Sequence, residues 1–343
     1  MPDQNPSLEH ILDESLDEDI LKKDVVVPRK GITLDFEPNQ GQPVFFIETD
    51  FVGSGVEDES LYVTDFSYRQ VWAELFSFPV SGVARGRNGF LLSPELIKQI
   101  SDERAATLNK RTVKLLLKGK DTVFLRGVLP EARATVSNSK LLDSMVAAYD
   151  DVDAFVPFVK KEDHLLQLVV TEEDSVITAS VAGGDRLYKL QQAVAVVNSE
   201  VGAAKASVAP AVHLPDYHAT IAIPRGTEFT VGSTHTDKDN LVHDISSVLR
   251  GRMSANDLKD LFKKAAGKTV GSPQQAAGIF QKRFNASNRT KDYVIGELER
   301  GQKEGTLYTD SLSLAIAVAR IAQRETVEHK RVHMYMAGKI LVG

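Results

Sequence analysis

Basic residues that lie close to aromatic ones offer the clearest chemistry in this chain. Arg85 and Arg87 belong to a short stretch with two glycines that ends at Phe90. More basic residues follow in and around a predicted strand: Lys110, Arg111, Lys114, Lys118 and Lys120. Alternate residues of a strand share one face, so Lys114 and Lys118 are predicted to lie together. Arginine and lysine bind phosphates, while Phe90 or Tyr68 could stack on a nucleic-acid base.

A second basic group with an aromatic neighbour lies nearer the C-terminus. Lys282 and Arg283 precede Phe284, and Arg289 follows. Both groups could instead be ordinary solvated surface, because most lysine and arginine side chains of a globular protein face water. The predicted nucleic-acid-binding residues are Arg85, Arg87, Lys110, Arg111, Lys114, Lys118, Lys282 and Arg283.

Histidine and aspartate also gather in one short segment that could bind a metal ion. Its members are His235, Asp237, Asp239 and His243. Imidazole nitrogen and carboxylate oxygen can share a Zn²⁺, Mn²⁺ or Mg²⁺ ion. The alternative, which the sequence favours, is a surface loop in which Asp237 or Asp239 caps the following helix. A weaker group contains His213 and His218, and a neutral histidine there is expected to be structural.

Recognised catalytic motifs are absent from the sequence. It contains no nucleophile elbow, no Cys–His pair and no glycine-rich phosphate loop of the Walker or dinucleotide-binding type. We therefore predict no catalytic residues, no metal site and no cofactor, and we interpret the chain as a non-enzyme.

Composition places the chain among ordinary soluble globular proteins. It has 343 residues, 42% of them hydrophobic and 26% charged. The absence of cysteine excludes disulfides and thiolate metal sites and fits a reducing cytoplasm. No apolar run approaches the ~20 residues that span a membrane, and the N-terminus lacks the features of a signal peptide.

Charge is distributed unevenly along the chain. Residues 1–75 are strongly acidic, residues 76–250 are almost neutral, and residues 251–343 are basic, within a net charge of -6. An acidic segment can shield a basic surface or imitate nucleic acid. It can equally be a simple solubilising tail.

Three segments resemble a known family. They read VTDFSYRQVWAELFSFP from Val63, TVFLRGVLPEARATVSNSKLLDSM from Thr122, and AVAVVNSEVGAAKASVAP from Ala193. In this order they resemble the phage/plasmid-like protein family, also described as domain-of-unknown-function family 932. The resemblance covers residues 63–250 and departs at Pro130-Glu131-Ala132. It implies a phage or plasmid setting and identifies no catalytic residue.

The pattern of apolar residues predicts three regions. Residues 1–30 are expected to form an acidic, disordered segment, residues 31–250 an α+β core domain, and residues 251–343 a helical region. Predicted strands include Ala132–Val136, and Leu165–Val170 followed by Ser175–Val181 with a turn at Glu172–Asp174 between them. Asp150–Val159 is predicted to connect two units. Ser311–Met336 is predicted to be one long helix whose second half leaves the core. Other helices are expected to begin at a cap formed by Thr64 or Asp65, by Ser254, and by Ser272 ahead of Pro273.

These observations predict a mixed, mainly antiparallel sheet core with flanking helices and an α-helical C-terminal region. The expected function is that of a non-enzymatic nucleic-acid-binding protein of phage or plasmid origin. Binding or annealing of single-stranded DNA in replication or recombination is its expected form, with a homo-oligomer and no membrane partner. One alternative is a structural, assembly or host-interaction phage protein. Another is a metal-dependent enzyme that acts on nucleic acid.

Overall fold

The computed structural model describes most of the chain. The described residues are 6–30, 32–39, 42–49, 60–80, 83, 85–86, 89–90, 92–107, 111–120, 122–149, 152–162, 164–181, 186–223, 229–230, 237–322 and 327–343. Their side chains are described except at 42–43, 49, 85–86, 89–90, 173–174, 229–230 and 327–331. No helix in these ranges combines the length and hydropathy needed to cross a membrane.

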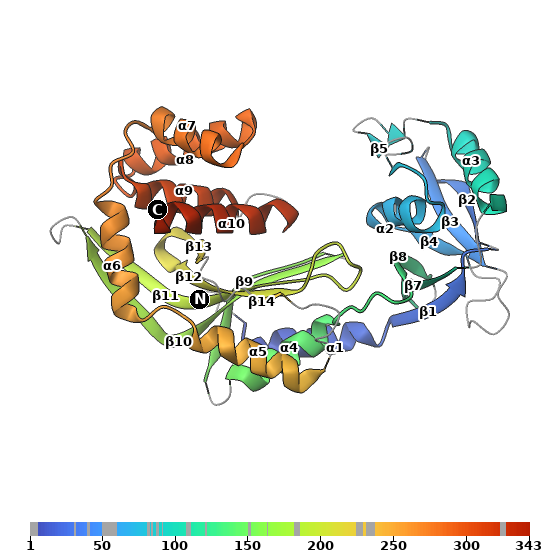
Figure 1. Ribbon diagram of the computed structural model, residues 1–343, viewed down its shortest axis with the longest axis horizontal. Coiled ribbons are helices and arrows are strands. Elements are labelled where there is room, and N and C mark those ends of the chain that lie inside the picture. The colour runs from blue at the N-terminus through green and yellow to red at the C-terminus, as the bar shows by residue number, and fades with distance from the viewer. Residues whose placement is uncertain are drawn as a thin grey trace.

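Strands from the first part of the chain form one six-stranded sheet, the first sheet (Figure 1). In spatial order its described strands are β1 (Lys22–Pro28), β7 (Thr112–Lys118), β8 (Phe124–Pro130), β4 (Leu61–Val63), β3 (Gln42–Thr49) and β2 (Ile32–Asn39). Neighbours are antiparallel except β4 and β8, which are parallel. Two-residue strands β5 (Arg85–Gly86) and β6 (Gly89–Phe90) pair with each other.

Helical segments cover one face of the first sheet. They are α2 (Asp65–Gln70), the π-helical turn η1 (Val71–Leu75) and α3 (Pro94–Thr107). Trp72, Leu75 and Ile97 from these segments are buried against alternate residues of the strands, such as Leu34 and Leu115. The residues between those, including Phe46, Tyr62 and Lys118, therefore point to the other face, which we call the outer face.

The second sheet is built from later, longer strands. Its order in the described residues is β13 (Ala219–Ala222), β12 (Ser207–Leu214), β11 (Arg186–Asn198), β10 (Leu165–Val181) and β9 (Ala154–Glu162), and β14 (Phe229–Thr230) also pairs with β12. Every pairing is antiparallel. A single turn of 3-10 helix, η4 (Pro215–Tyr217), joins β12 to β13.

Both faces of the second sheet are covered by helices. Leu168, Val194 and Val208 face α1 (Leu8–Asp19), α4 (Asn138–Tyr149) and α5 (Lys238–Arg250). Val169 and Ala195 face the opposite way, toward Met334. The C-terminal helices on that side and at the far end of the sheet are α6 (Ala255–Ala266), α7 (Pro273–Phe284), α8 (Asn288–Lys303), α9 (Ser311–Ala322) and α10 (Val327–Val342).

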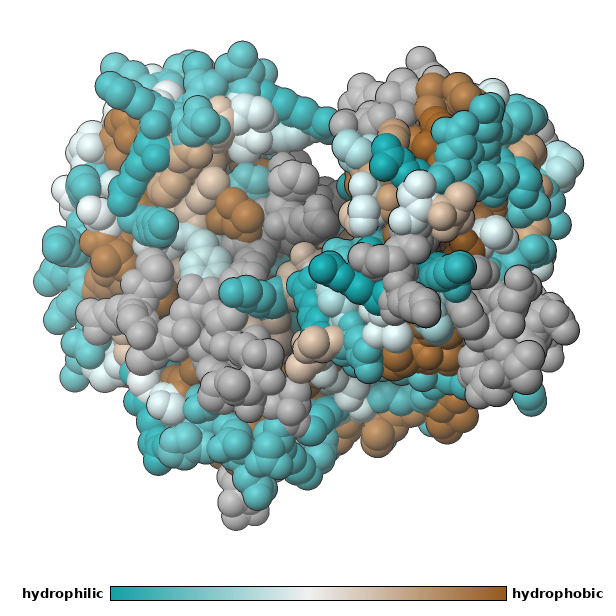
Figure 2. All heavy atoms as spheres, turned by 45° about the vertical axis from the view of Figure 1, so that its right-hand side comes forward, coloured by the Kyte–Doolittle hydropathy of each residue, from teal (hydrophilic) through white to brown (hydrophobic). Residues whose placement is uncertain are grey.

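The chain thus forms two lobes, each around its own sheet (Figure 1). The first lobe comprises β1 to β8 with α2, η1 and α3, and the second comprises α1 and everything from α4 onward. In Figure 2 the lobes form separate masses on either side of a hollow, and hydrophilic side chains border it. The C-terminal helices share one hydrophobic cluster with β10 to β13, so the packing joins residues 251–343 to the second sheet.

The predicted fold class is confirmed, and so are several helix ends. The structure is α+β with two mainly antiparallel sheets and a helical C-terminal region. Thr64 caps α2, Ser254 caps α6, and Ser272 caps α7 ahead of Pro273. Each hydroxyl accepts a hydrogen bond from a backbone N–H that would otherwise lack a partner, which is why these signals are reliable.

Local patterns misled the prediction at four places in the middle and C-terminal parts of the chain. The expected turn at Glu172–Asp174 is part of one continuous strand, β10, whose register shifts between Thr171 and Val176. The expected connector contains strand β9, where Pro157 is tolerated because β9 is an edge strand. Ala132–Val136 is not a strand. The predicted long helix is two helices, α9 and α10, that pack side by side and bury Met334 and Ile340.

The N-terminal segment also differs from the expectation of disorder. Residues 6–30 contain α1 and β1, and Leu8 and Ile11 of α1 are buried in the second lobe. β1 pairs with β7 in the first sheet. Acidic composition hid this structure, because the few apolar residues of α1 lie on one side of the helix and suffice to anchor it.

Candidate functional site

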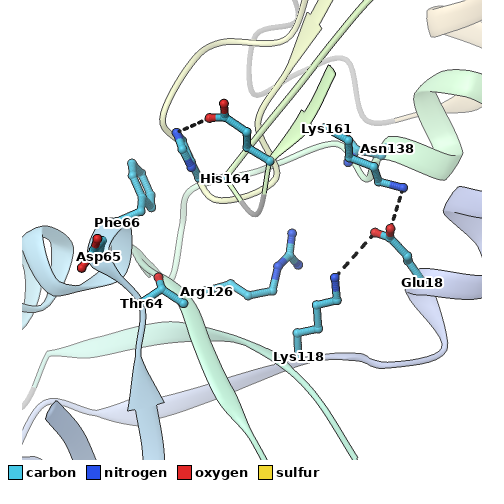
Figure 3. Close-up of a pocket in the computed structure, with 10 residues that line it drawn as sticks. Glu18, Thr64, Asp65, Phe66, Lys118, Arg126, Asn138, Lys161 and His164 are labelled. Atoms are coloured by element: carbon cyan, nitrogen blue, oxygen red, sulfur yellow. Dashed lines mark ion pairs between the residues drawn. The ribbon is translucent and has the colours of Figure 1, made fainter. Parts of the chain in front are cut away.

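A pocket lies where the two lobes meet, and we call it the interlobe pocket. Its volume is about 670 Å³. The lining residues are Glu18, Thr64, Asp65, Phe66, Lys118, Arg126, Asn138, Lys161, Glu162 and His164. Figure 3 shows Lys118, Arg126 and Thr64 reaching from the first sheet toward side chains of the second lobe. The cationic side chains of Lys118, Arg126 and Lys161 therefore line the same pocket.

A strand irregularity places Arg126 in the pocket. Leu116 of β7 pairs with Gly127 of β8, while Leu117 pairs with Leu125. Arg126 is therefore one extra residue inserted in β8, which forms a β-bulge. Such a bulge bends the strand and redirects the side chain. Arg126 is consequently turned toward the second lobe rather than left within a regular ladder.

Glu18 binds two of the pocket lysines. Its carboxylate lies 2.9 Å from Lys161 Nζ and 3.8 Å from Lys118 Nζ, as the dashed lines of Figure 3 mark. Lys161 lies on β9 and Lys118 at the end of β7, so Glu18 links the two lobes. Ser15 Oγ, one turn earlier in α1, accepts a hydrogen bond of 3.4 Å from Lys161.

Aromatic rings border the opposite side of the pocket. The rings of Phe66 and His164 are stacked, with centroids 4.7 Å apart and planes 7° from parallel. Phe66 begins α2 in the first lobe, while His164 lies in the β9–β10 turn of the second. His164 Nε2 also lies 3.6 Å from Glu162. This stack is a second contact between the lobes.

Glu200 is the buried centre of the junction behind the pocket. It lies 2.9 Å from Lys22, forms an ion pair with Arg126, and accepts a hydrogen bond of 2.6 Å from the backbone N–H of Asn138. Only 7% of Glu200 is exposed. Burial alone would raise the pKa of this carboxyl, but Lys22 and Arg126 hold the pKa below its usual value.

The segment Asn198–Gly202, which carried the family resemblance, is the loop that docks the second lobe on the first. Gln70 of α2 bridges the lobes, because its amide donates to Val201 O at 2.8 Å and accepts from Val128 N at 2.8 Å. Gly202 has a φ of +76° and lies against Leu129 and Arg133 of the first lobe. The side-chain amide of Asn198 donates hydrogen bonds to Val136 O and Asn138 Oδ1. Val201 and Gly202 thus contact the first lobe, while Asn198 fixes the start of the loop within the second lobe.

A row of aromatic residues crosses the outer face of the first sheet. Phe46 is the register partner of Tyr62, and Tyr62 is the register partner of Phe124. The ring centroids are 6.0 Å apart for the first pair and 6.2 Å apart for the second. Phe124 is 46% exposed, and the other two rings are half-buried. We call these three residues the aromatic row.

Two lysines continue the aromatic row toward the edge of the sheet. Lys118 is the register partner of Phe124, and Lys22 is the register partner of Lys118. Lys118 also lines the interlobe pocket, so the row ends at the pocket. At the other side of the row, Glu37 lies close to Tyr62 and raises the pKa of its phenol.

The structure brings together only some of the predicted nucleic-acid-binding residues. Lys114 and Lys118 share the outer face, as expected, and Lys114 is near enough to Asp24 to interact with it. Arg111 is exposed just before β7. Arg87, Lys110 and the side chain of Arg85 lie outside the described residues.

Lys282 and Arg283 are separate from this group. They lie in the last turn of α7 in the second lobe, where Arg283 donates to the backbone oxygen of Lys339 at 3.0 Å. The guanidinium carbon of Arg283 lies 5.3 Å from the centroid of the Phe284 ring. Lys282 and Arg283 belong to the second basic group of the sequence analysis, which lies on a different lobe from the residues of β7.

The histidine and aspartate groups have ordinary structural roles where they are described. Asp237 caps α5 by accepting from Asn240 N at 3.4 Å, and His243 is exposed on that helix. His235 lies outside the described residues. His213 is buried beside Thr220, with 3.0 Å between Nδ1 and Oγ1. Across the described part of the chain, no three acidic or histidine side chains are grouped as metal ligands.

Several residues of the site escaped the sequence reasoning. Phe46, Tyr62 and Phe124 come from strands that are distant in the sequence, and Lys161 comes from the segment predicted to be a connector. The alternation of side chains along a strand is the one sequence signal for these residues, because it predicts that Phe45 and Phe46 lie on opposite faces of the sheet. No sequence pattern states that β4 lies between β3 and β8.

Comparison with known proteins yields no relative. No protein-family model matches the chain, and no curated protein matches it significantly. The resemblance to the phage/plasmid-like family consequently stays a prediction.

Proposed function

We propose that this protein binds single-stranded nucleic acid, without catalysis, across the outer face of its first sheet and into the interlobe pocket. The observation that carries the proposal is the continuous row from Phe46 through Tyr62 and Phe124 to Lys118 and Lys22. It combines stacking surfaces and phosphate-binding groups in one line, which is the combination that single strands require.

The aromatic row suits bases that are not paired. Every base has a flat π-face, so stacking on aromatic side chains binds single strands with little sequence preference. In a duplex those faces are already stacked on each other. Phe124 is the most exposed of the three rings and is expected to make the largest contribution.

The lysines suit the phosphates of the same strand. Lys118 of β7 and Lys161 of β9 line the interlobe pocket at the end of the aromatic row. Their contacts to phosphate oxygens would be independent of sequence and would weaken with salt. The Phe66–His164 stack adds an aromatic surface at the pocket.

Access to the outer face supports the proposal as well. The helical segments that pack on the first sheet, α2, η1 and α3, bury their apolar residues on its other face. On the outer face Phe124 is 46% exposed and Phe46 and Tyr62 are half-buried, so a ligand can reach these rings. A role in replication or recombination on a phage or plasmid, and a homo-oligomeric state, remain predictions of the sequence.

The test is binding of a fluorescent oligothymidylate, followed by anisotropy at several salt concentrations. Phe124→Ala should weaken binding by the ~1–3 kcal/mol that one stacked base contributes. Tyr293→Ala is the matched control, because Tyr293 on α8 is 44% exposed while Phe124 is 46% exposed. Lys118→Gln should weaken binding by removing one phosphate contact, whereas Lys282→Gln should leave the affinity unchanged.

Two results would overturn this function. One is the absence of binding at about 50 mM salt, where electrostatic contacts are strong; an assembly role would then be favoured. The other is an equal loss of affinity in Phe124→Ala and Tyr293→Ala, which would show that the outer face has no special part.

A further inference from the structure

The acidic helix α1 places a carboxylate where a phosphate of the ligand would bind. Glu18 contacts Lys161 at 2.9 Å and Lys118 at 3.8 Å, and all three residues line the interlobe pocket. Lys118 is also the first cation beyond the aromatic row. A strand stacked on that row would thus meet lysines that already hold an anion.

The backbone of α1 is anchored independently of Glu18. Leu8 and Ile11 are buried against the second lobe, and α1 packs along α4. Asp19, the next residue, binds Ser139 and Lys22. The Glu18 side chain is 34% exposed, so its end can rotate into water while the helix stays in place. Displacement requires only a change of rotamer, whose cost is small at a partly exposed position.

We propose that Glu18 is a built-in competitor of the nucleic-acid phosphate, which lowers affinity and confines tight binding to ligands that can displace it. This inference rests on the proposed function. In the free protein, Glu18 neutralises Lys118 and Lys161. In the complex, a phosphate takes its place between the two ammonium groups, and the carboxylate turns to solvent.

The mechanism predicts a distinct dependence on salt. When a phosphate binds free lysines, it releases the counterions that accompany them, and this release makes affinity fall with salt. When it displaces Glu18, the lysines have few counterions to release. Removal of the Glu18 charge should therefore make the salt dependence steeper as well as the binding tighter.

The experiment compares Glu18→Gln with wild type and with Glu9→Gln. Glu9 is exposed in the first turn of the same helix, so its substitution changes the net charge equally. It lies roughly 13 Å along the helix from Glu18 by the rise per residue, about one Debye length at 0.1 M salt. Oligothymidylate binding is measured by anisotropy across salt concentrations, and pyrophosphate binding is measured by calorimetry as a probe of the pocket cations alone.

Glu18→Gln should bind oligothymidylate about two- to fivefold more tightly, as expected from the loss of partly exposed ion pairs. The slope against log salt should steepen by up to about 0.7, which corresponds to the one phosphate that takes the place of the carboxylate. Pyrophosphate affinity should rise by a similar factor. Glu9→Gln should match wild type in all three measurements.

The outcomes separate this inference from the proposed function. If wild type binds oligothymidylate but Glu18→Gln shows neither tighter binding nor a steeper slope, the competitor role is wrong and the function stands. If no variant binds oligothymidylate, the function is wrong. In that case, tighter pyrophosphate binding by Glu18→Gln still supports an anion site held by Glu18, and unchanged pyrophosphate binding overturns it.

Discussion

Glu200→Gln should destabilise the contact between the lobes strongly. Glutamine has nearly the same shape and can still accept the hydrogen bond from Asn138 N, but it removes the negative charge that faces Arg126 and Lys22. Lys22 keeps Asp19 as a partner. The main cost therefore comes from Arg126, whose side chain is only 9% exposed.

The size of the effect follows from this burial. Removal of one partner from a buried ion pair costs about 3–5 kcal/mol, because the other charge stays without compensation. The retained hydrogen bond and the Lys22–Asp19 pair place the expected loss near the lower end, about 3 kcal/mol. The exposed Glu103 on α3 provides the control: Glu103→Gln should change the free energy of unfolding by less than about 0.5 kcal/mol.

The protein contains one tryptophan, which makes the assay specific. Trp72 is buried in the first lobe, so its fluorescence in urea reports on that lobe, whereas far-ultraviolet circular dichroism reports on both. In Glu200→Gln the fluorescence midpoint should fall, because the first lobe loses its main electrostatic link to the second. Adding Arg126→Met should recover most of the loss, since an apolar replacement removes the buried charge that faced Glu200.

The pH dependence offers an independent check on Glu200. The pKa of Glu200 is lowered in the folded protein, so its stabilising contribution is present above the unfolded value of about 4.5 and is lost as pH falls through the folded value. Glu200→Gln should lack this part of the acid destabilisation. A loss of stability no larger than that of Glu103→Gln, or a double variant whose loss equals the sum of the single losses, would refute the reasoning.

Two further predictions concern positions away from the site. Burial lowers the pKa of His213 from its usual 6.5 to about 4. As the pH falls, the unfolded chain therefore binds a proton before the folded protein does. The free energy of unfolding should decline by about 3 kcal/mol between pH 6.5 and 4. His213→Gln should flatten urea-derived stability over that window, while His10→Gln, at an exposed position, should leave the slope unchanged. Asp237→Ala should cost about 1 kcal/mol by removing the cap of α5, and a thermal melt unaffected by this substitution would contradict the capping role.

Local features of the structure were readable from the sequence. The caps Thr64, Ser254 and Ser272, and most strands, depend on hydrogen bonds and side-chain alternation within a few residues. The fold class followed from the same patterns. The sequence analysis also singled out Asn198–Gly202 and Lys118. It did not predict that the first lies at the contact between the lobes or that the second lines a pocket there.

Errors arose where a distant contact overrides the local signal. Glu172 lies within β10 because it pairs with Ala154 of β9 and because Arg252 binds its carboxylate at 2.5 Å. The acidic start of the chain is ordered over α1 because Leu8 and Ile11 find a surface on the second lobe. Neither partner is visible from the neighbouring residues.

The sequence by itself determined many of the helices and strands, the class of fold and the shared face of Lys114 and Lys118 on β7. Only the tertiary structure decided which residues share a surface. Strand order places Phe46, Tyr62 and Phe124 side by side. The contact between the two lobes places Lys161 and Glu18 beside Lys118. The physical reason is the separation along the sequence over which each interaction acts. Helix caps and strand alternation depend on residues a few positions apart, whereas strand pairing and lobe docking join residues that are distant in the sequence.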